Sequence, residues 1–485
     1  MRQKIIFYLN GKRKEAGAEQ ASMMLADYLR YDQSLTGTKI VCAEGDCGAC
    51  SVLRYFPHVP TSVDAQNYLA VNSCITVLAQ LDGSSLVTVD ALKKNEELHP
   101  AQSAMVKCHG SQCGFCTPGF VMAITGMMEE KISKSQTTLT SQEAKNCMTG
   151  NLCRCTGYQP IIDAALSIDL KNVESIKSRF YSDHQAQELR AAFAESVHIE
   201  SEHFSFFAPK TLKEALLYLK ANPDAKIMGA ATDLGVIHNK RKITLTKLVS
   251  LHLMSELYSI DEKAGMVQVG ARVTLTELRH FMKDKISEFA HYLDIFASPQ
   301  IKNIGTVIGN IANASPIGDT PSAFLALNAT VCVYGDTGER EVALSEFFLA
   351  YRTINIKPGE IITAIKFKLP EVNSTLKLYK NSNRKDLDIS AVNLAINVAW
   401  TDQTQKELKE ITIAAGGVAA TPLRLKKTET FLKSRPLSQA TIDLAVKEFH
   451  SEFKPLSDVR ATSAYRRVLI ENYFRKFFTD AGVGQ

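Results

Sequence analysis

Cysteine is the residue type in this sequence whose number and spacing point most directly to chemistry. The chain holds 11 cysteines, and ten of them fall between Cys42 and Cys155, which leaves only Cys332 elsewhere. An odd number of cysteines in a chain with no signal-peptide pattern argues against a disulfide framework. Thiols gathered in one segment of a protein from a reducing compartment are typical of metal sites. We therefore expect a cytoplasmic protein that binds metal through this segment.

The first cysteine set has the spacing C-x4-C-x2-C and a fourth cysteine after 23 intervening residues. This is the plant-ferredoxin arrangement for a [2Fe–2S] cluster, which needs four thiolates around two bridged irons. Gly45 and Gly48 let the backbone curl and point N–H groups at the cluster sulfurs. A zinc site or unrelated core cysteines are the alternatives, and the spacing suits zinc poorly. The sequence predicts a cluster held by Cys42, Cys47, Cys50 and Cys74.

The second cysteine set consists of a C-x2-C pair and a C-x-C pair. Taken alone, this pattern is read as zinc about as readily as iron–sulfur. Beside a first cluster, a second redox centre is the better interpretation, because electron transfer uses chains of centres. The ligands would be Cys113, Cys116, Cys153 and Cys155. Cys108, Cys147 and Cys332 fall outside both patterns and are interpreted as packing residues.

The elements that must position these cysteines differ between the two sets. The pattern of residues 1–87 predicts a small β-rich unit. It includes a strand over 5–9, a type I′ turn at Asn10-Gly11 and a return strand. Residues 88–168 predict helices, with Thr117 as an N-cap, a capping box at 140–143 and a further helix starting near Pro160. Residues 169–203 predict a linker with some helix.

The remaining residues, 204–370 and a smaller α+β unit at 371–485, mix strands with helices. Strands are predicted over 226–228, 330–334, 394–400 and 411–415, and capping boxes at 211–214 and 274–277. No G-x-G-x-x-G follows a strand here, so a Rossmann site is not supported. Two glycine-containing segments, 229–235 and 305–310, could hold phosphates, although composition alone favours two tight turns.

Composition places the chain among ordinary globular proteins. Its 485 residues are 45% hydrophobic and 22% charged, with a formal charge of +5. That length predicts roughly three domains at about 100–200 residues each. The small, dispersed positive charge argues against a dedicated nucleic-acid or membrane-surface binder. No apolar run approaches the length of a membrane span.

Longer motifs around these cysteines and glycines carry a family resemblance. SQCGFCTPGF (111–120) and GNLCRCTGYQPI (150–161), downstream of a plant-type cluster loop, resemble the iron–sulfur half of the xanthine oxidase family of molybdenum hydroxylases. GAATDLG (229–235) and IGTVIGNIANASPIGD (304–319) resemble the family's two FAD-binding segments. The resemblance implies a multidomain α+β fold. Its parts would be a β-grasp ferredoxin-like domain (1–87), a four-helix [2Fe–2S] domain (88–168), a linker (169–203), an FAD-binding domain (204–370) and a C-terminal flavoprotein domain (371–485).

The resemblance also implies particular flavin contacts. By position these are Gly229, Ala230, Ala231, Thr232, Asp233, Leu234, Gly235, Phe296, Gly305, Thr306, Gly309, Asn310, Asn313, Asp319, Ile362 and Lys380. Arg384 and Asp388 would influence flavin electrostatics and nicotinamide access, and Gln112 would face the molybdenum cofactor at a subunit interface. Two departures stand out: 36 residues separate Cys116 from Cys153, a few more than expected, and Ala230 replaces the usual glycine.

The function implied is that of the small subunit of a bacterial two-chain xanthine dehydrogenase. The sequence runs to Gln485 without a molybdopterin portion, so we expect that portion on a large partner subunit in an (αβ)₂ heterotetramer. Electrons from hypoxanthine or xanthine would pass through the two [2Fe–2S] clusters to FAD and then to NAD⁺. For the substrate, the alternative is the equivalent subunit for another N-heterocycle or an aldehyde. For the electron acceptor, it is oxygen or another molecule. For the function as a whole, it is a zinc-stabilised scaffold without redox function.

Overall fold

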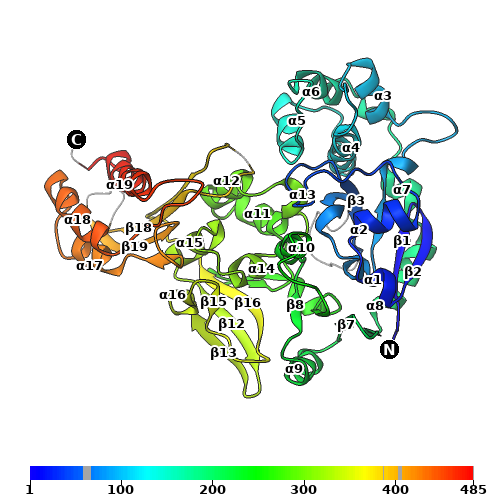
Figure 1. Cartoon of the computed structure of the whole chain (residues 1–485). Helices are drawn as coiled ribbons and strands as arrows, with labels where there is room; N and C mark the ends of the chain where they lie inside the picture. The colour runs from blue at the N-terminus through cyan, green and yellow to red at the C-terminus, as the bar shows by residue number, and fades with distance from the viewer. Residues whose placement is uncertain (58–66, 386, 402–406, 484–485) are drawn as a thin grey trace. The chain divides into compact units, whose positions relative to one another are not determined.

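The computed structural model describes residues 1–57, 67–385, 387–401 and 407–483 (Figure 1). The chain forms two compact units. The first comprises Met1–Tyr258, Thr274–Glu277 and Ser298–Gly305, and the second comprises Ser259–Val273, Leu278–Ala297 and Thr306–Gln485. Within the described residues, no helix combines the length and the apolar character that crossing a bilayer requires.

The first unit opens with a five-stranded sheet in the order β2-β1-β5-β3-β4. Its strands are β1 (Ile5–Leu9), β2 (Lys12–Ala16), β3 (Ser51–Tyr55), β4 (Leu69–Asn72) and β5 (Ser85–Val87), with short helices α1 (Ala18–Ala21) and α2 (Leu25–Asp27). Asn10 and Gly11 have φ of 53° and 78°, as a type I′ hairpin turn requires. The predicted hairpin is therefore confirmed. Buried Ile5, Phe7 and Leu25 join one hydrophobic core.

Four helices follow and group together, in cyan to blue-green, in Figure 1. They are α3 (Pro100–Lys107), α4 (Thr117–Ser133), α5 (Ser141–Met148) and α6 (Gln159–Leu166). Phe120 and Ile124 of α4 share a core with Leu53 of β3 and with Tyr68, which immediately precedes β4. The capping box at Thr140 is confirmed. The prediction for Thr117 is wrong by one position, because Cys116 is the N-cap and Thr117 is the first helical residue.

Residues 169–203 contain regular elements that pack on their neighbours. These are α7 (Ile176–Phe180), α8 (Asp183–Phe193) and β6 (Val197–Glu200). Ile176 and Phe180 enter the core of the four-helix group. Strand β6 pairs with β7 in a second sheet of order β6-β7-β9-β8. The remaining elements of the first unit are β7 (Ser205–Ala208), α9 (Leu212–Ala221), β8 (Lys226–Met228), α10 (Thr232–Asn239), β9 (Lys247–Ser250) and α13 (Pro299–Lys302).

The second unit contains an antiparallel sheet in the order β10-β11-β16-β12-β13. Its strands are β10 (Ile260–Lys263), β11 (Met266–Gly270), β12 (Thr330–Gly335), β13 (Gly338–Ala343) and β16 (Ile361–Lys368). Near this sheet in the sequence, the second unit also contains α12 (Ser287–Ile295), α14 (Val307–Ala312), α15 (Asp319–Ala326), α16 (Leu344–Phe347) and a hairpin of β14 (Phe348–Ala350) and β15 (Thr353–Ile354). Helix α11 (Leu275–Lys283) begins at the predicted capping box, where Glu277 N–H donates to Thr274 Oγ1.

A second antiparallel sheet, β17-β18-β19-β20, is covered on both faces. Its elements are β17 (Ser374–Asn381), β18 (Val392–Trp400), β19 (Leu408–Gly416), β20 (Leu423–Arg424), α17 (Lys426–Lys433), α18 (Gln439–Ser451) and α19 (Ser463–Asp480). Alternate residues such as Leu394 and Ile396 pack in one core with α17, α18 and α19. Residues of the opposite parity face α15, where Asn393 donates to the Gly318 carbonyl and Thr412 to the Ala326 carbonyl. The predicted strands over 394–400 and 411–415 are confirmed.

Candidate functional site

The first cysteine set converges on one point of the first unit. Cys42, Cys47 and Cys50 lie on an irregular loop before β3, and Cys74 lies in a turn of 3₁₀ helix after β4. The Cys42 thiol contacts those of Cys47 and Cys74, and Cys50 contacts Cys74. The N–H groups of Glu44 and Cys47 donate to Cys42 Sγ, each at 3.4 Å. The loop presents three thiols and at least two backbone N–H donors to a shared centre, and the 3₁₀ turn adds the fourth thiol.

Two glycines give the loop its curvature. Gly45 and Gly48 have φ of 72° and 66°, in the left-handed region. A Cβ placed on Gly48 would lie only 2.2 Å from the Gly150 carbonyl oxygen. A side chain is therefore excluded at Gly48 both by conformation and by space.

The close approach of these thiols changes their acidity in opposite directions. Hydrogen bonds from Cys47 and Cys74 lower the pKa of Cys42, whereas the hydrogen bonds to Cys42 and Cys50, together with burial, raise the pKa of Cys74. A positive centre among them would favour thiolate at all four positions. The donor set fits a [2Fe–2S] cluster, which takes four thiolates. Among the described residues, no group of three or more His, Cys, Asp or Glu is arranged to hold a single metal ion.

The second cysteine set is split between two loops of the four-helix group. Cys113 and Cys116 precede α4, and Cys153 and Cys155 precede α6. Cys113 Sγ lies 3.6 Å from Cys155 Sγ, and Cys116 contacts Cys153. Burial, with the bond to Cys153, raises the pKa of Cys116 to about 12. The two cross-loop pairs supply the four sulfur donors that a second [2Fe–2S] cluster requires.

Two of the three cysteines outside the patterns, Cys108 and Cys147, pack against the helical core, and the third lies in a strand of the second unit. Cys108 Sγ lies 3.8 Å from Ser167 Oγ, and Cys147 Sγ donates to the Ala144 carbonyl. Cys332 is buried in β12. Gln112, next to Cys113, is exposed.

The two cysteine loops contact each other directly. Leu152 N–H donates to the Cys47 carbonyl at 3.0 Å, and Asn151 Nδ2 donates to the Gly48 carbonyl at 3.0 Å. Buried Gln300 of α13 donates to Asn151 Oδ1 at 2.8 Å. Sequence reasoning did not identify Asn151 or Gln300. The position of Asn151 two residues before Cys153 offers a local signal for the first, whereas nothing in the sequence marks the second.

The predicted phosphate-binding segment 229–235 lies between β8 and α10 in the first unit. Ala231 is the N-cap of α10 with φ of 51°, whereas Ala230 does not have a positive φ. Helix α10 packs on the first cysteine set, since Asn239 Nδ2 donates to the carbonyls of Ala43 and Cys74, each at 2.8 Å. Thr232, Asp233 and Leu234 form the first turn of α10. The backbone N–H groups of a helix's first turn can bind a phosphate.

The second predicted phosphate-binding segment divides between the units. Gly305 ends the first unit, and Thr306, Gly309, Asn310 and Asn313 belong to the second. Thr306 is the N-cap of α14 and accepts a hydrogen bond from Gly309 N–H at 3.0 Å. Asn310 Oδ1 accepts from Thr320 Oγ1 at 2.6 Å.

Three of the predicted flavin contacts come together inside the second unit. Lys380 Nζ forms an ion pair with Asp319 Oδ2 at 2.5 Å and lies 5.9 Å from the centre of the Phe296 ring. The Lys380 and Asp319 side chains are 2% and 4% exposed. Ile362 is buried in β16. Arg384 and Asp388 pair with each other, with Arg384 N–H donating to Asp388 Oδ2 at 3.0 Å.

A network that sequence reasoning missed holds Asp319 in place. Its Oδ1 accepts from Ser390 Oγ at 2.5 Å, Tyr292 Oη at 3.2 Å and Asn393 Nδ2 at 3.2 Å. Together with the bond from Lys380, these donors satisfy both oxygens of the Asp319 carboxylate. Among the described residues, this carboxylate is the one hydrogen-bond acceptor of the Lys380 ammonium. A buried ammonium with spare N–H donors needs a further acceptor. The oxygen and nitrogen atoms of a flavin ring fit that requirement.

Three family models match separate segments of the chain. They are the "[2Fe-2S] binding domain" over 88–166, the "FAD binding domain in molybdopterin dehydrogenase" over 202–370 and the "CO dehydrogenase flavoprotein C-terminal domain" over 377–481.

Similar curated proteins include xanthine dehydrogenases. Xanthine dehydrogenase 1 of Arabidopsis thaliana is 29% identical over 543 residues, covering 98% of this chain and 39% of that protein. The xanthine dehydrogenase of Drosophila subobscura is 29% identical over 530 residues, with the same coverage of both chains. The chain thus spans about two fifths of the length of these relatives.

Solved structures resemble part of the chain. A cyanide-inactivated Cu,Mo-CO dehydrogenase chain is 27% identical with a TM-score of 0.53, covering 56% of this chain and 95% of that chain. Quinoline 2-oxidoreductase from Pseudomonas putida 86, at 23% identity and a TM-score of 0.52, covers 58% of this chain and 98% of that chain and shares the fold. The predicted fold class is confirmed. The chain matches a [2Fe–2S]-binding, an FAD-binding and a flavoprotein C-terminal domain model, in the order that the resemblance to the xanthine oxidase family implies.

Proposed function

We propose that this chain is the electron-transfer component of a molybdenum hydroxylase. The observation that carries the proposal is the direct contact between its two four-thiol sets, through the Leu152 N–H and the Cys47 carbonyl at 3.0 Å. Loaded with their groups, the clusters would supply one-electron transfer, and FAD would exchange single electrons for a hydride. The second cysteine set, in the four-helix group (the helical set), would face the molybdenum partner. The first cysteine set, in the ferredoxin-like part (the ferredoxin-like set), would face the flavin.

The chain's own residues would hold these groups by charge and backbone hydrogen bonds. Cys42, Cys47, Cys50 and Cys74 would bind one cluster, and Cys113, Cys116, Cys153 and Cys155 the other. Backbone N–H groups such as that of Glu44 would stabilise negative charge at the sulfurs. As the family resemblance implies, we propose that the segments 229–235 and 305–310 contribute to FAD binding. Lys380 would offer its spare N–H donors to the flavin ring.

The contact of α10 with the Cys74 carbonyl supports the order of the centres. Asn239 ties the helix that follows the proposed phosphate-binding loop to the ferredoxin-like cluster loop. An electron leaving that cluster would therefore meet the flavin-binding segment next. We propose the boundaries 1–87, 88–168, 169–203, 204–370 and 371–485 for the corresponding parts.

For the substrate we propose hypoxanthine and xanthine, with NAD⁺ as the acceptor and the molybdenum cofactor on a large partner subunit in an (αβ)₂ heterotetramer. Support comes from the xanthine dehydrogenases that match 98% of this chain. The alternative is the same component serving another N-heterocycle, an aldehyde or a different small substrate. It is favoured by the resemblance of part of the chain to a CO dehydrogenase chain and by the match of residues 377–481 to the CO dehydrogenase flavoprotein C-terminal domain.

The test is an activity measurement on the complex retrieved from its own cells by a tag on this chain. Xanthine-dependent NADH formation is the expected result. A flavin-containing, molybdenum-bearing complex that oxidises another heterocycle or an aldehyde, but not xanthine, would move the substrate to the alternative. Purification of the chain without any molybdenum-bearing partner would contradict the proposed complex itself.

A further inference from the structure

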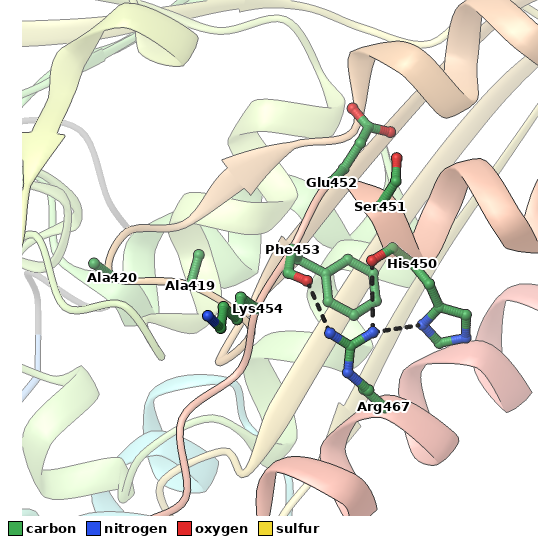
Figure 2. Close-up of a pocket in the computed structure, with 8 residues that line it drawn as sticks. All are labelled: Ala419, Ala420, His450, Ser451, Glu452, Phe453, Lys454 and Arg467. Carbon is green, nitrogen blue, oxygen red and sulfur yellow. Dashed lines mark hydrogen bonds between the residues drawn. The ribbon is translucent and has the colours of Figure 1, made fainter.

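A cavity of about 520 Å³ lies in the C-terminal part of the second unit, away from the cysteine loops and from Lys380 in the sequence. It is lined by Ala419, Ala420, His450, Ser451, Glu452, Phe453, Lys454 and Arg467 (Figure 2). These residues come from the loop after β19, the C-terminal end of α18 and the segment after it, and the first turns of α19. The volume lies in the range of small-molecule pockets, about 300–1,000 Å³.

The arginine of this cavity is held only by neutral acceptors. Its guanidinium donates to His450 Nδ1 at 3.4 Å, to the His450 carbonyl at 3.5 Å and to the Phe453 carbonyl at 3.4 Å (Figure 2). All three bonds are long for N–H···O or N–H···N contacts. Across the ranges that the structure describes, none of the hydrogen bonds of Arg467 goes to a carboxylate. Its positive charge therefore stays available to a ligand.

The acidic groups near the arginine are engaged elsewhere. Glu452 points away from the guanidinium in Figure 2, and its two oxygens accept from Lys427 N–H and Thr428 N–H at the start of α17, both at 2.8 Å. Glu471 accepts from His450 Nε2 at 2.7 Å and from Arg475 Nε at 2.8 Å. The bond to Glu471 fixes the His450 ring so that Nδ1 faces Arg467.

A second cation lines the same cavity. Lys454 is exposed, and within the described part of the chain its ammonium is not paired with a carboxylate. The two alanines leave space beside it, and the Phe453 ring packs under Arg467 at 5.6 Å. The cavity thus offers two positive charges, one of them a planar fork suited to bidentate binding of an oxyanion.

We propose that this cavity is a binding site for a small phosphate-bearing anion. The phosphate oxygens would accept hydrogen bonds from Arg467 and Lys454, and the volume leaves room for further atoms of the ligand. The site is independent of the clusters and the flavin, so its test needs no measurement of enzymatic activity.

The experiment titrates inorganic phosphate into the purified full-length complex by calorimetry at constant ionic strength, with acetate as the carboxylate probe. Phosphate is expected to bind saturably and more tightly than acetate. Arg467→Gln should weaken phosphate binding by about tenfold or more, and Lys454→Gln should weaken it to a smaller extent. The matched control is Arg435→Gln, which removes an arginine stacked on Phe431 in the same domain but outside the cavity, and should leave binding unchanged.

Three results would overturn the proposal. They are the absence of saturable phosphate binding to the wild type, acetate binding as tight as phosphate, and equal weakening in the Arg435→Gln and Arg467→Gln variants. If Arg467→Gln fails to fold, two other variants test the proposal. Arg467→Lys keeps the charge but loses the planar guanidinium, and Lys454→Gln changes an exposed residue. Both should weaken phosphate binding.

Discussion

The carbonyl oxygen of Cys47 accepts a hydrogen bond from the N–H of Leu152 at 3.0 Å. Cys47 belongs to the first cysteine set, and Leu152 precedes Cys153 of the second. One hydrogen bond and a few covalent bonds therefore join the two proposed ligand sets. Such a short through-bond connection suits electron transfer between neighbouring centres.

Asn151→Ala tests the importance of this contact. It removes a buried side chain that donates to the Gly48 carbonyl and accepts from Gln300. Leaving these partners unpaired should lower the free energy of unfolding by about 3 kcal/mol and slow electron transfer between the clusters. Stopped-flow reduction followed by absorbance measures the rate. Asn146→Ala, on an exposed face of α5, is the control and should change neither quantity.

Gly48→Ala tests the packing of the two cysteine loops. The new Cβ would lie 2.2 Å from the Gly150 carbonyl at a backbone φ of 66°. We expect a loss of at least about 3 kcal/mol in stability, together with loss of iron from the ferredoxin-like set. Iron analysis and thermal unfolding check both. Gly17→Ala meets no atom within 4 Å and should retain full iron content, so similar losses in both variants would contradict the packing argument.

Much of this architecture follows from local sequence signals, and the contacts between modules do not. Asn10-Gly11 predicts its hairpin because a type I′ turn needs two positive φ values, and the cysteine spacing predicts which thiols gather. Gln300 reaches Asn151 across 149 positions, and Asn239 reaches the Cys74 carbonyl across 165. No periodicity or turn chemistry encodes such pairs. Ser390 and Asn393 are similar, because only the fold brings them to Asp319.

Ala231→Gly tests the strained start of α10. Ala231 takes the left-handed conformation at φ of 51°, which is unfavourable for any residue with a Cβ. Glycine should raise the free energy of unfolding by about 0.5–1 kcal/mol. Ala230→Gly, at a position without a positive φ, should instead lower it by a similar amount. Urea unfolding of both variants measures the two opposite changes, and changes of the same sign would contradict this account.

The buried carboxylate of Asp82 predicts a pH dependence of stability. Burial raises its pKa, but hydrogen bonds from Arg2 and His252 outweigh this and lower the pKa from 3.8 to about 2. The folded-state pKa lies below the unfolded value, so Asp82 contributes about 2 kcal/mol above pH 4, lost as the pH falls towards 2. Urea unfolding of the wild type and Asp82→Asn at stepped pH checks this, since the difference between their free energies of unfolding should shrink as the pH falls below about 4.

Electron paramagnetic resonance of the dithionite-reduced protein tests the central claim most directly. Two distinct [2Fe–2S] signals are expected in the wild type. Cys50→Ser should abolish or alter only the signal of the ferredoxin-like set, and Cys113→Ser only that of the helical set. Cys108→Ser, which changes a packing cysteine, should preserve both. A colourless protein that contains zinc and gives no signal on reduction would contradict the account.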